Sequence, residues 1–255
     1  MAEDAVLITQ PNPRVWTLTM NRPDKRNSLS QALMEGLQRG LSEAEADSNC
    51  RLVVLAGRQN FFCTGMDFEE ATQGASATEM GEGQDYMSLL KRFASSPKIV
   101  ISKIEGTVLA GGMGLVAASD LVVATPASRF GLPEALWGLL PANVMPFLIR
   151  RVGFQAAYRL TLTTETITAE EASRIGLVDT LSDRPDDDIR RYLLRLGRLD
   201  EQTIRDAKAY FQKMWFLTEE MEQTAIAELN RLVRTERVRQ NIKNYVEYQK
   251  FPWET

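Results

Sequence analysis

Short apolar runs alternate with longer segments of helical periodicity through the first half of the chain. The short runs have the length and bounding turn residues of strands, at residues 5–9, 15–20, 52–56, 98–104 and 121–124. Between them we expect helices over 30–46, over 86–95 and from the glycines near 111 to about residue 118. This alternation predicts an α/β fold.

The second half of the chain is mainly helical. We expect short helices at 141–152, 155–162 and 169–175, followed by amphipathic helices at 189–199, 201–215 and 218–248. A charged segment at 182–188 marks a boundary, and a polar, glycine-rich stretch at 72–84 reads as a mobile loop. The sequence thus predicts a core over residues 1–185 and a helical C-terminal region over 186–255 that packs on this core or on a neighbouring subunit.

Composition narrows the class of partner. The formal net charge of −4, from 34 acidic and 30 basic residues, argues against nucleic acid as a partner. No signal peptide and no apolar run of about 20 residues is present, so we expect a cytoplasmic protein that does not insert into a membrane. Two cysteines, Cys50 and Cys63, are too few for a disulfide framework or a zinc site. We expect both to be thiols buried in the core. We also expect the protein to bind no metal and no cofactor.

The chain contains no histidine. This excludes Ser-His-Asp and Cys-His nucleophiles and zinc sites of the H-E-x-x-H type, all of which need an imidazole. Any acid–base chemistry therefore falls to carboxylates, tyrosine or lysine.

Two glycine turns are candidates for binding an anion. Gly111 and Gly112 lie where a strand meets a helix, and a helix N-terminus exposes unpaired N–H groups to an approaching ligand. A second turn, around Gly65, can present the N–H of Met66. Two such amides directed at one carbonyl oxygen would stabilise an enolate. Taken alone, glycines at such positions more often serve an ordinary tight turn or a close packing contact.

Glu134 is the candidate acid–base residue. It follows Pro133 at an expected helix start, where an acidic side chain also compensates the helix dipole. Its neighbours Phe130, Leu132 and Trp137 are apolar, and apolar surroundings raise the pKa of a carboxyl group toward neutrality. A tryptophan such as Trp137 belongs more often to a hydrophobic core than to a pocket wall.

Taken together, these motifs resemble the crotonase, or enoyl-CoA hydratase/isomerase, superfamily. The resemblance covers about residues 5–180 and is carried by Asn21-Arg22-Pro23 with Asn27, Phe62-x-x-Gly65-x-Asp67, Gly106 with Ala110-Gly111-Gly112, Phe130-x-x-Pro133-Glu134, Gly138-x-x-Pro141, Arg151-x-Gly153 and Ala169-x-x-Ala172-x-x-x-Gly176-Leu177-Val178. It implies a crotonase-like spiral of ββα units, a helical C-terminal region, thioester substrates and a homotrimer or hexamer. It also implies an oxyanion hole made by the Met66 and Gly111 amides.

The chain departs from the usual family pattern at two places. Gly114 stands where typical hydratases carry the first of two glutamates, and Glu134 matches the second. The usual glycine-rich turn is replaced by Pro141-Ala142-Asn143-Val144-Met145-Pro146-Phe147. Both departures, with the Phe251-Pro252-Trp253-Glu254 ending, resemble the dehydratases of polyketide β-branching. The resemblance implies a substrate of 3-hydroxy-3-methylglutaryl bound to an acyl carrier protein and a 3-methylglutaconyl product.

For such an elimination, Glu134 would move the protons, and Tyr86 or Asn143 could supply a second donor. Gly112, Gly114 and Trp137 are further candidate pocket residues. Lys91 and Arg92 could meet the distal carboxylate of the substrate, although a solvated helix face explains them as well. Lys25 and Arg26 could meet the phosphate of the carrier or of CoA.

Three other functions stay open on the sequence. A hydratase or isomerase acting on a CoA thioester would use the same site, and so would a decarboxylase of the same cassette. A crotonase-like scaffold without catalytic activity, or an RNA-binding homologue, belongs to a different class. The intact Glu134 argues against the scaffold, and the acidic balance of charge argues against RNA binding.

Overall fold

Four stretches of the chain each give one strand to a large sheet and one to a small sheet. The computed structural model describes residues 4–73, 81–214 and 218–254. The large sheet has the strand order β1-β2-β3-β5-β7-β10, and the small sheet has the order β4-β6-β8-β9. The pairs β3/β4, β5/β6, β7/β8 and β10/β9 occupy corresponding places in the two strand orders. This confirms the expected α/β spiral.

In the large sheet, parallel pairing joins every neighbouring pair except β1 and β2, which are antiparallel. Its strands are β1 (Val6–Asn12), β2 (Val15–Met20), β3 (Leu52–Ala56), β5 (Ile99–Ile104), β7 (Leu121–Ala124) and β10 (Thr180–Leu181). All residues of β3 are buried, because helices cover both faces of a parallel sheet.

The small sheet positions the site. Its strands are β4 (Phe61–Cys63), β6 (Thr107–Leu109), β8 (Arg129–Gly131) and β9 (Thr166–Thr168). Strands β4, β6 and β8 are parallel neighbours, and β9 closes the sheet antiparallel to β8. The carboxyl ends of the three parallel strands therefore meet at one edge of the sheet.

Helices over the core follow the apolar periodicity of the sequence. They are α1 (Gln31–Ala46), α2 (Phe68–Gln73), α3 (Gly81–Ser95), α4 (Gly111–Ala118), α5 (Met145–Val152), α6 (Phe154–Thr163) and α7 (Ala169–Arg174), with short 3-10 helices η1 (Pro23–Lys25) and η2 (Pro133–Trp137). Ser30 caps α1, since its hydroxyl accepts a hydrogen bond from the Leu33 amide at 3.2 Å. The buried stripe of α1 comprises Leu33, Leu37 and Leu41.

The structure describes only the two ends of the loop expected at 72–84, and both ends are helical. Helix α2 extends to Gln73 and α3 begins at Gly81, while residues 74–80 lie outside the described residues. The helix expected at 141–152 begins later, at Met145, because residues 141–144 form a turn. In this turn the Pro141 carbonyl accepts hydrogen bonds from the Val144 and Met145 amides, both at 3.0 Å.

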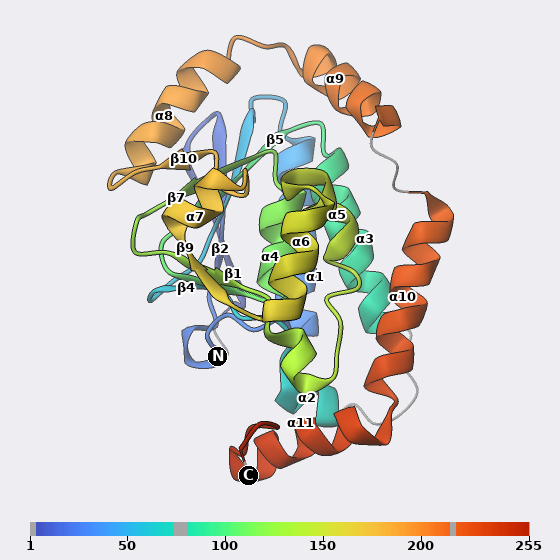
Figure 1. Cartoon of the computed structure of the whole chain (residues 1–255). Coiled ribbons are helices and arrows are strands. Elements are labelled where there is room, and N and C mark those ends of the chain that lie inside the picture. Colours follow the sequence, from blue (N-terminus) through green and yellow to red (C-terminus); the bar gives the residue numbers. More distant parts are fainter. Residues whose placement is uncertain (1–3, 74–80, 215–217, 255) are drawn as a thin grey trace.

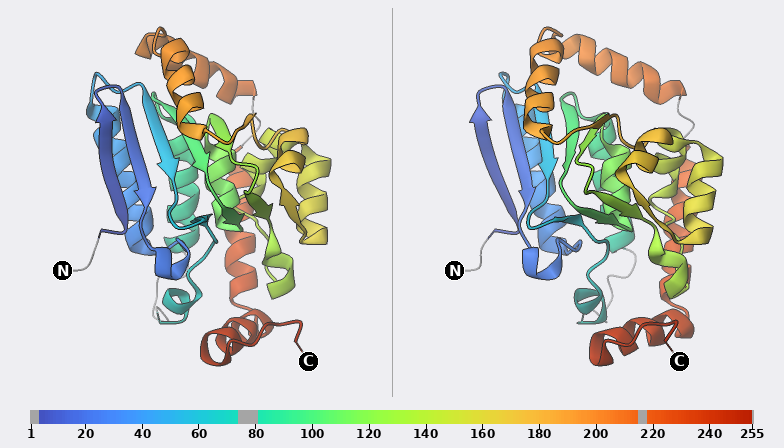
Figure 2. Two further views of the ribbon diagram at one scale, coloured as in Figure 1. Left: turned by 90° about the vertical axis from the view of Figure 1, so that its left-hand side faces the viewer. Right: turned by 60° about the vertical axis from the view of Figure 1, so that its left-hand side comes forward.

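The C-terminal helices are α8 (Pro185–Leu196), α9 (Glu201–Met214), α10 (Glu219–Val233) and α11 (Glu236–Tyr248). Helices α8 and α9 lie at one end of the molecule and α11 at the other, with α10 between them (Figures 1 and 2). The single helix expected over 218–248 is wrong: Thr235 has extended backbone angles and breaks it in two. The division of the chain at residue 185 stays a prediction.

Two apolar layers cover the two faces of the large sheet, and a third apolar cluster packs Trp137 and Leu139 against α10 and α11. The larger buries one face of the large sheet against α1, α3 and α4. The smaller packs Ile189 of α8 and Ile204 of α9 against the other face, on residues that include Val54 and Ile101. Cys50 and Cys63 are buried free thiols, as expected, and burial raises the pKa of Cys50 to about 11 and that of Cys63 to about 12. No helix of the described ranges is long and apolar enough to cross a lipid bilayer.

Candidate active site

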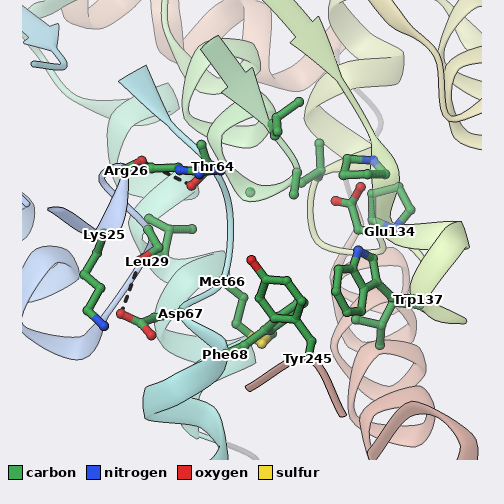
Figure 3. Close-up of a pocket in the computed structure, with 18 of the residues that line it drawn as sticks. Lys25, Arg26, Leu29, Thr64, Met66, Asp67, Phe68, Glu134, Trp137 and Tyr245 are labelled. Carbon is green, nitrogen blue, oxygen red and sulfur yellow. Dashed lines mark hydrogen bonds between the residues drawn. The ribbon is translucent and has the colours of Figure 1, made fainter. Parts of the chain in front are cut away.

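A cavity of about 650 Å³ lies at the carboxyl-terminal edge of the small sheet. Met66 follows β4, Gly111 follows β6 and Glu134 follows β8, and all three line this cavity. The strand order β4-β6-β8 therefore places the two backbone amides side by side and the carboxyl group beyond Gly111. Figure 3 shows Glu134 and Trp137 on one side of the cavity and Lys25, Arg26 and Leu29 on the other.

The two amide-bearing turns are in contact. A Cβ atom added to Gly65, which has φ of +91°, would lie 3.4 Å from the Gly111 nitrogen and 2.5 Å from the Cβ of Ala110. Within the described ranges, neither the Met66 nor the Gly111 amide donates to a protein acceptor. Both N–H groups are thus available to a ligand oxygen, as an oxyanion hole requires.

Ala110 sets the direction of the Gly111 amide. Its φ of +51° and ψ of −123° lie outside the regions that L-residues favour. The Ala110 amide donates to the Gly131 carbonyl at 3.0 Å, and its own carbonyl accepts from Met113 at 2.8 Å. These two hydrogen bonds hold the strained turn in place.

Glu134 is fixed by the short helix η2. Pro133 starts this helix, and Gly138, with φ of +82°, ends it. The Oε2 atom of Glu134 is buried and has no hydrogen-bond partner. Burial raises the pKa of Glu134 to about 8. A carboxyl group with such a pKa exchanges protons near neutral pH.

Tyr86 fills the space that a side chain at position 114 would need. A Cβ atom added to Gly114 would overlap the Tyr86 hydroxyl and lie 3.1 Å from Leu90 Cδ1. The Tyr86 hydroxyl donates a hydrogen bond to the Gly111 carbonyl. Burial, with smaller contributions from Cys63 and Glu134, raises the pKa of Tyr86 well above its usual value. Tyr86 therefore stays a neutral donor that is already bound to the backbone of the glycine turn.

This arrangement predicts coupling between positions 86 and 114. In Gly114→Ala the new methyl group displaces the phenol from the Gly111 carbonyl, and we expect kcat/KM to fall about tenfold. In Tyr86→Phe the overlapping oxygen is absent, so adding Gly114→Ala should cost much less. A double-mutant cycle on kcat/KM measures this coupling, and two strictly additive effects would show that the phenol and the glycine act separately.

Asn143 and Trp137 also line the cavity. Asn143 is only 2% exposed, and its Nδ2 donates to the Gly83 carbonyl of α3 at 2.8 Å. Trp137 packs edge-on against Phe68 and Tyr245, with ring centroids 4.8 Å and 5.2 Å away. Its carbonyl accepts a hydrogen bond from Asn241 of α11 at 3.1 Å. Trp137 thus serves both a small apolar core and the cavity wall.

Lys25 and Arg26 lie at the opposite wall. Lys25 is paired with Glu69 at 2.5 Å, and the Arg26 guanidinium lies 5.6 Å from the ring centre of Phe61. Lys25 is the last residue of η1, and Arg26, with φ of +51°, ends this helix.

Four residues predicted for the pocket are absent from its described wall. Lys91 pairs with Glu222 of α10 at 2.6 Å, and Arg92 pairs with Glu45 of α1 at 2.9 Å. Each side chain is directed to a different helix and neither lines the described cavity wall, so the prediction that they line the pocket is wrong. Gly112 and Gly114 lie beneath the wall: a Cβ at Gly112 would meet Cys63, and one at Gly114 would meet Tyr86.

Several wall residues were missed from the sequence. Leu29 lies just before α1, Phe68 begins α2, and the C-terminal part of the chain contributes Tyr245, Phe251 and Trp253. The Phe-Pro-Trp motif was the signal for the last group, because an aromatic cluster at the end of a helical region needs a surface to cover.

Known proteins that are similar to this chain are hydratases and dehydratases. The family model described as enoyl-CoA hydratase/isomerase matches residues 11–255. The chain belongs to the enoyl-CoA hydratase/isomerase family. The bacillaene synthase dehydratase PksH of Bacillus subtilis is 35% identical to this chain, and the alignment covers 94% of this chain and 93% of PksH. The 2,3-dehydroadipyl-CoA hydratase of Escherichia coli is also 35% identical, over 75% and 74%.

Solved structures of this family superpose over nearly the whole chain. The crystal structure of Bacillus subtilis PksH, described for polyketide biosynthesis as an enoyl-CoA hydratase, has a TM-score of 0.89 at 32% identity, covering 97% of this chain and 99% of PksH. An enoyl-CoA hydratase of Mycobacterium avium has a TM-score of 0.85 at 31% identity, covering 99% and 100%. The relatives are hydratases and dehydratases, and the chain is accordingly an enzyme of the hydro-lyase type.

Proposed function

We propose that this enzyme dehydrates 3-hydroxy-3-methylglutaryl-acyl carrier protein to 3-methylglutaconyl-acyl carrier protein in polyketide β-branching. The observation that carries the proposal is the lone, buried and unpartnered carboxyl oxygen of Glu134 beside two free amides. Of the three other carboxylates on the wall, Asp67 is paired with Arg22, Glu69 is paired with Lys25, and Asp24 is exposed to solvent. The similarity to a dehydratase named for bacillaene synthase supports the choice of a polyketide substrate.

The reaction is an elimination that one carboxyl group can complete. The Met66 and Gly111 amides donate to the thioester oxygen and stabilise the enolate as Glu134 removes the α-proton. The bond between the β-carbon and its hydroxyl oxygen then breaks, and Glu134 returns the proton to the departing hydroxyl, which leaves as water. Glu134 ends ionised, as it began. The chemistry moves protons and a hydroxyl group only, so we propose that it needs no cofactor beyond the phosphopantetheine thioester.

The rate should depend on pH through Glu134. Burial raises the pKa of Glu134 to about 8, so at pH 6 this carboxyl group is protonated in the free enzyme. A protonated carboxyl group cannot remove the α-proton of the substrate. We expect kcat/KM to rise about tenfold per pH unit from pH 6 and to level off near pH 8. The pH profile of kcat/KM checks this, and a profile that is flat or falls across this range would contradict it.

The carrier preference separates our proposal from a hydratase or isomerase that acts on CoA thioesters. Lys25 and Arg26 lie at the wall opposite Glu134, where they could meet the phosphate of either thioester. A steady-state comparison of the same acyl group on the carrier and on CoA should give a higher kcat/KM for the carrier. Equal or higher values with CoA would favour the alternative. Release of carbon dioxide instead of water would identify the decarboxylase.

We also propose that the chain acts in the cytoplasm as a homotrimer or hexamer. Helix α6 presents Phe154, Tyr158 and Leu162 on one stripe, with 64%, 49% and 61% of these side chains exposed in the single chain. An exposed apolar stripe of this kind favours a protein contact. Light scattering after gel filtration should give a mass of three or six chains, and a monomer would refute the proposal.

A further inference from the structure

Two buried polar atoms on the cavity wall lack a partner. They are Oε2 of Glu134 and Oδ1 of Asn143. Buried polar atoms are almost always hydrogen-bonded, so an unpaired one on a residue that lines a cavity indicates where a ligand can supply the missing partner. Glu134 already has a role in the proposed elimination, whereas Asn143 does not.

The orientation of the Asn143 amide is fixed from outside the cavity. A carbonyl oxygen can only accept, so the atom that meets the Gly83 carbonyl at 2.8 Å must be the NH2 group. The backbone of Asn143 is held in the turn whose Pro141 carbonyl accepts from Val144 and Met145. The atom left over is Oδ1, which accepts hydrogen bonds and cannot donate one. Asn143 is therefore no proton donor, contrary to the expectation from the sequence.

We infer that Asn143 Oδ1 accepts a hydrogen bond from the β-hydroxyl group of the substrate, the group that leaves as water. This inference rests on the proposed function and names the residue that selects its substrate. A hydroxyl group that donates to Asn143 keeps its oxygen lone pairs free for the proton that Glu134 returns. Asn143 thus orients the leaving group without taking part in proton transfer.

Asn143 Oδ1 also disfavours a carboxylate group in the position of the β-hydroxyl group. An ionised carboxylate only accepts hydrogen bonds, so it leaves Asn143 Oδ1 unpaired and adds repulsion between two acceptors. A substrate whose reacting group is a carboxylate, as in decarboxylation, therefore fits this wall less well than a β-hydroxy acyl group. It follows that the distal carboxylate of the glutaryl chain lies away from Asn143.

Binding measurements on an inactive enzyme test the inference. In a Glu134→Gln background, dissociation constants are measured for 3-hydroxy-3-methylglutaryl carrier protein and for 3-methylglutaryl carrier protein, which lacks only the hydroxyl. Adding Asn143→Leu should weaken binding of the hydroxylated carrier about tenfold and change binding of the other less than about twofold. Asn143→Ala should give the same selectivity, which covers the case in which the leucine variant does not fold.

Asn230 provides a matched control. Its Oδ1 would lie 3.4 Å from a Cβ on the same Gly83, yet Asn230 is not among the residues that line the cavity. Asn230→Leu should leave both dissociation constants unchanged. Equal losses for both carriers in the Asn143 variants, or no loss for either, would overturn the inference. If neither carrier binds while Asn143 is intact, the proposed substrate itself is wrong, and the inference falls with it.

Discussion

Replacing Glu134 with glutamine should lower kcat for dehydration by about 10³-fold or more. The single carboxyl group removes the α-proton and returns it to the leaving hydroxyl, and glutamine can do neither. Proton transfer by a positioned side chain commonly contributes about 10²–10⁴-fold, and here one residue serves two transfers. Single-turnover kinetics with the carrier-bound substrate, followed by mass spectrometry, measure the loss.

The control for this variant is substrate binding. Glutamine has nearly the shape of glutamate and keeps the hydrogen-bonding capacity at this wall, so the dissociation constant should change little. The melting temperature shows whether the variant is folded. A folded Glu134→Gln enzyme that retains more than about a tenth of the wild-type kcat would remove Glu134 from the mechanism.

Gly65→Ala should lower kcat/KM by about 10²-fold. The new methyl group would lie 2.5 Å from the Cβ of Ala110 and would push apart the turns that carry the Met66 and Gly111 amides. Loss of one oxyanion donor commonly costs about 3 kcal/mol of transition-state stabilisation. Steady-state kinetics should show the loss mainly in kcat, because the hydrogen bonds strengthen as charge develops on the thioester oxygen.

Gly153→Ala separates this effect from backbone strain. Gly153 has φ of +79°, close to the +91° of Gly65, but a Cβ atom there meets nothing within 4 Å. It should lower the melting temperature through strain alone and leave kcat/KM unchanged. If Gly65→Ala and Gly153→Ala behave alike, the contact between the two turns has no part in catalysis.

The sequence predicted the features that depend on local pattern. Five of the six strands of the large sheet follow from apolar runs, β10 being the exception, and Ser30 marks the start of α1 because a cap is a local signal. The turns at Gly65 and Gly111 were located for the same reason, since glycines between a strand and a helix stand out in any sequence. Their convergence with Glu134 needed the strand order β4-β6-β8, which periodicity does not reveal.

Other features depend on contacts between distant residues. Nothing in the sequence says that Tyr86 occupies the space above Gly114, since 28 positions separate them and only the packing of α3 on α4 brings them together. The contribution of Tyr245 and Trp253 to the cavity likewise depends on how α11 docks.

The error at Lys91 and Arg92 has a simpler cause. Along α3 the buried residues Tyr86, Leu90 and Phe93 mark the inner face, and positions 91 and 92 fall outside it. The helical periodicity of this segment alone therefore places both side chains outside the inner face of α3.

The most direct test of the proposed dehydration is the mass of the acyl group on the carrier. The purified chain is incubated with 3-hydroxy-3-methylglutaryl carrier protein, and the acyl-phosphopantetheine fragment is followed by mass spectrometry. We predict loss of one water with the wild-type chain and no loss with Glu134→Gln. An unchanged acyl mass with the wild-type chain, a loss of carbon dioxide, or a loss of water that survives Glu134→Gln would contradict the proposed function.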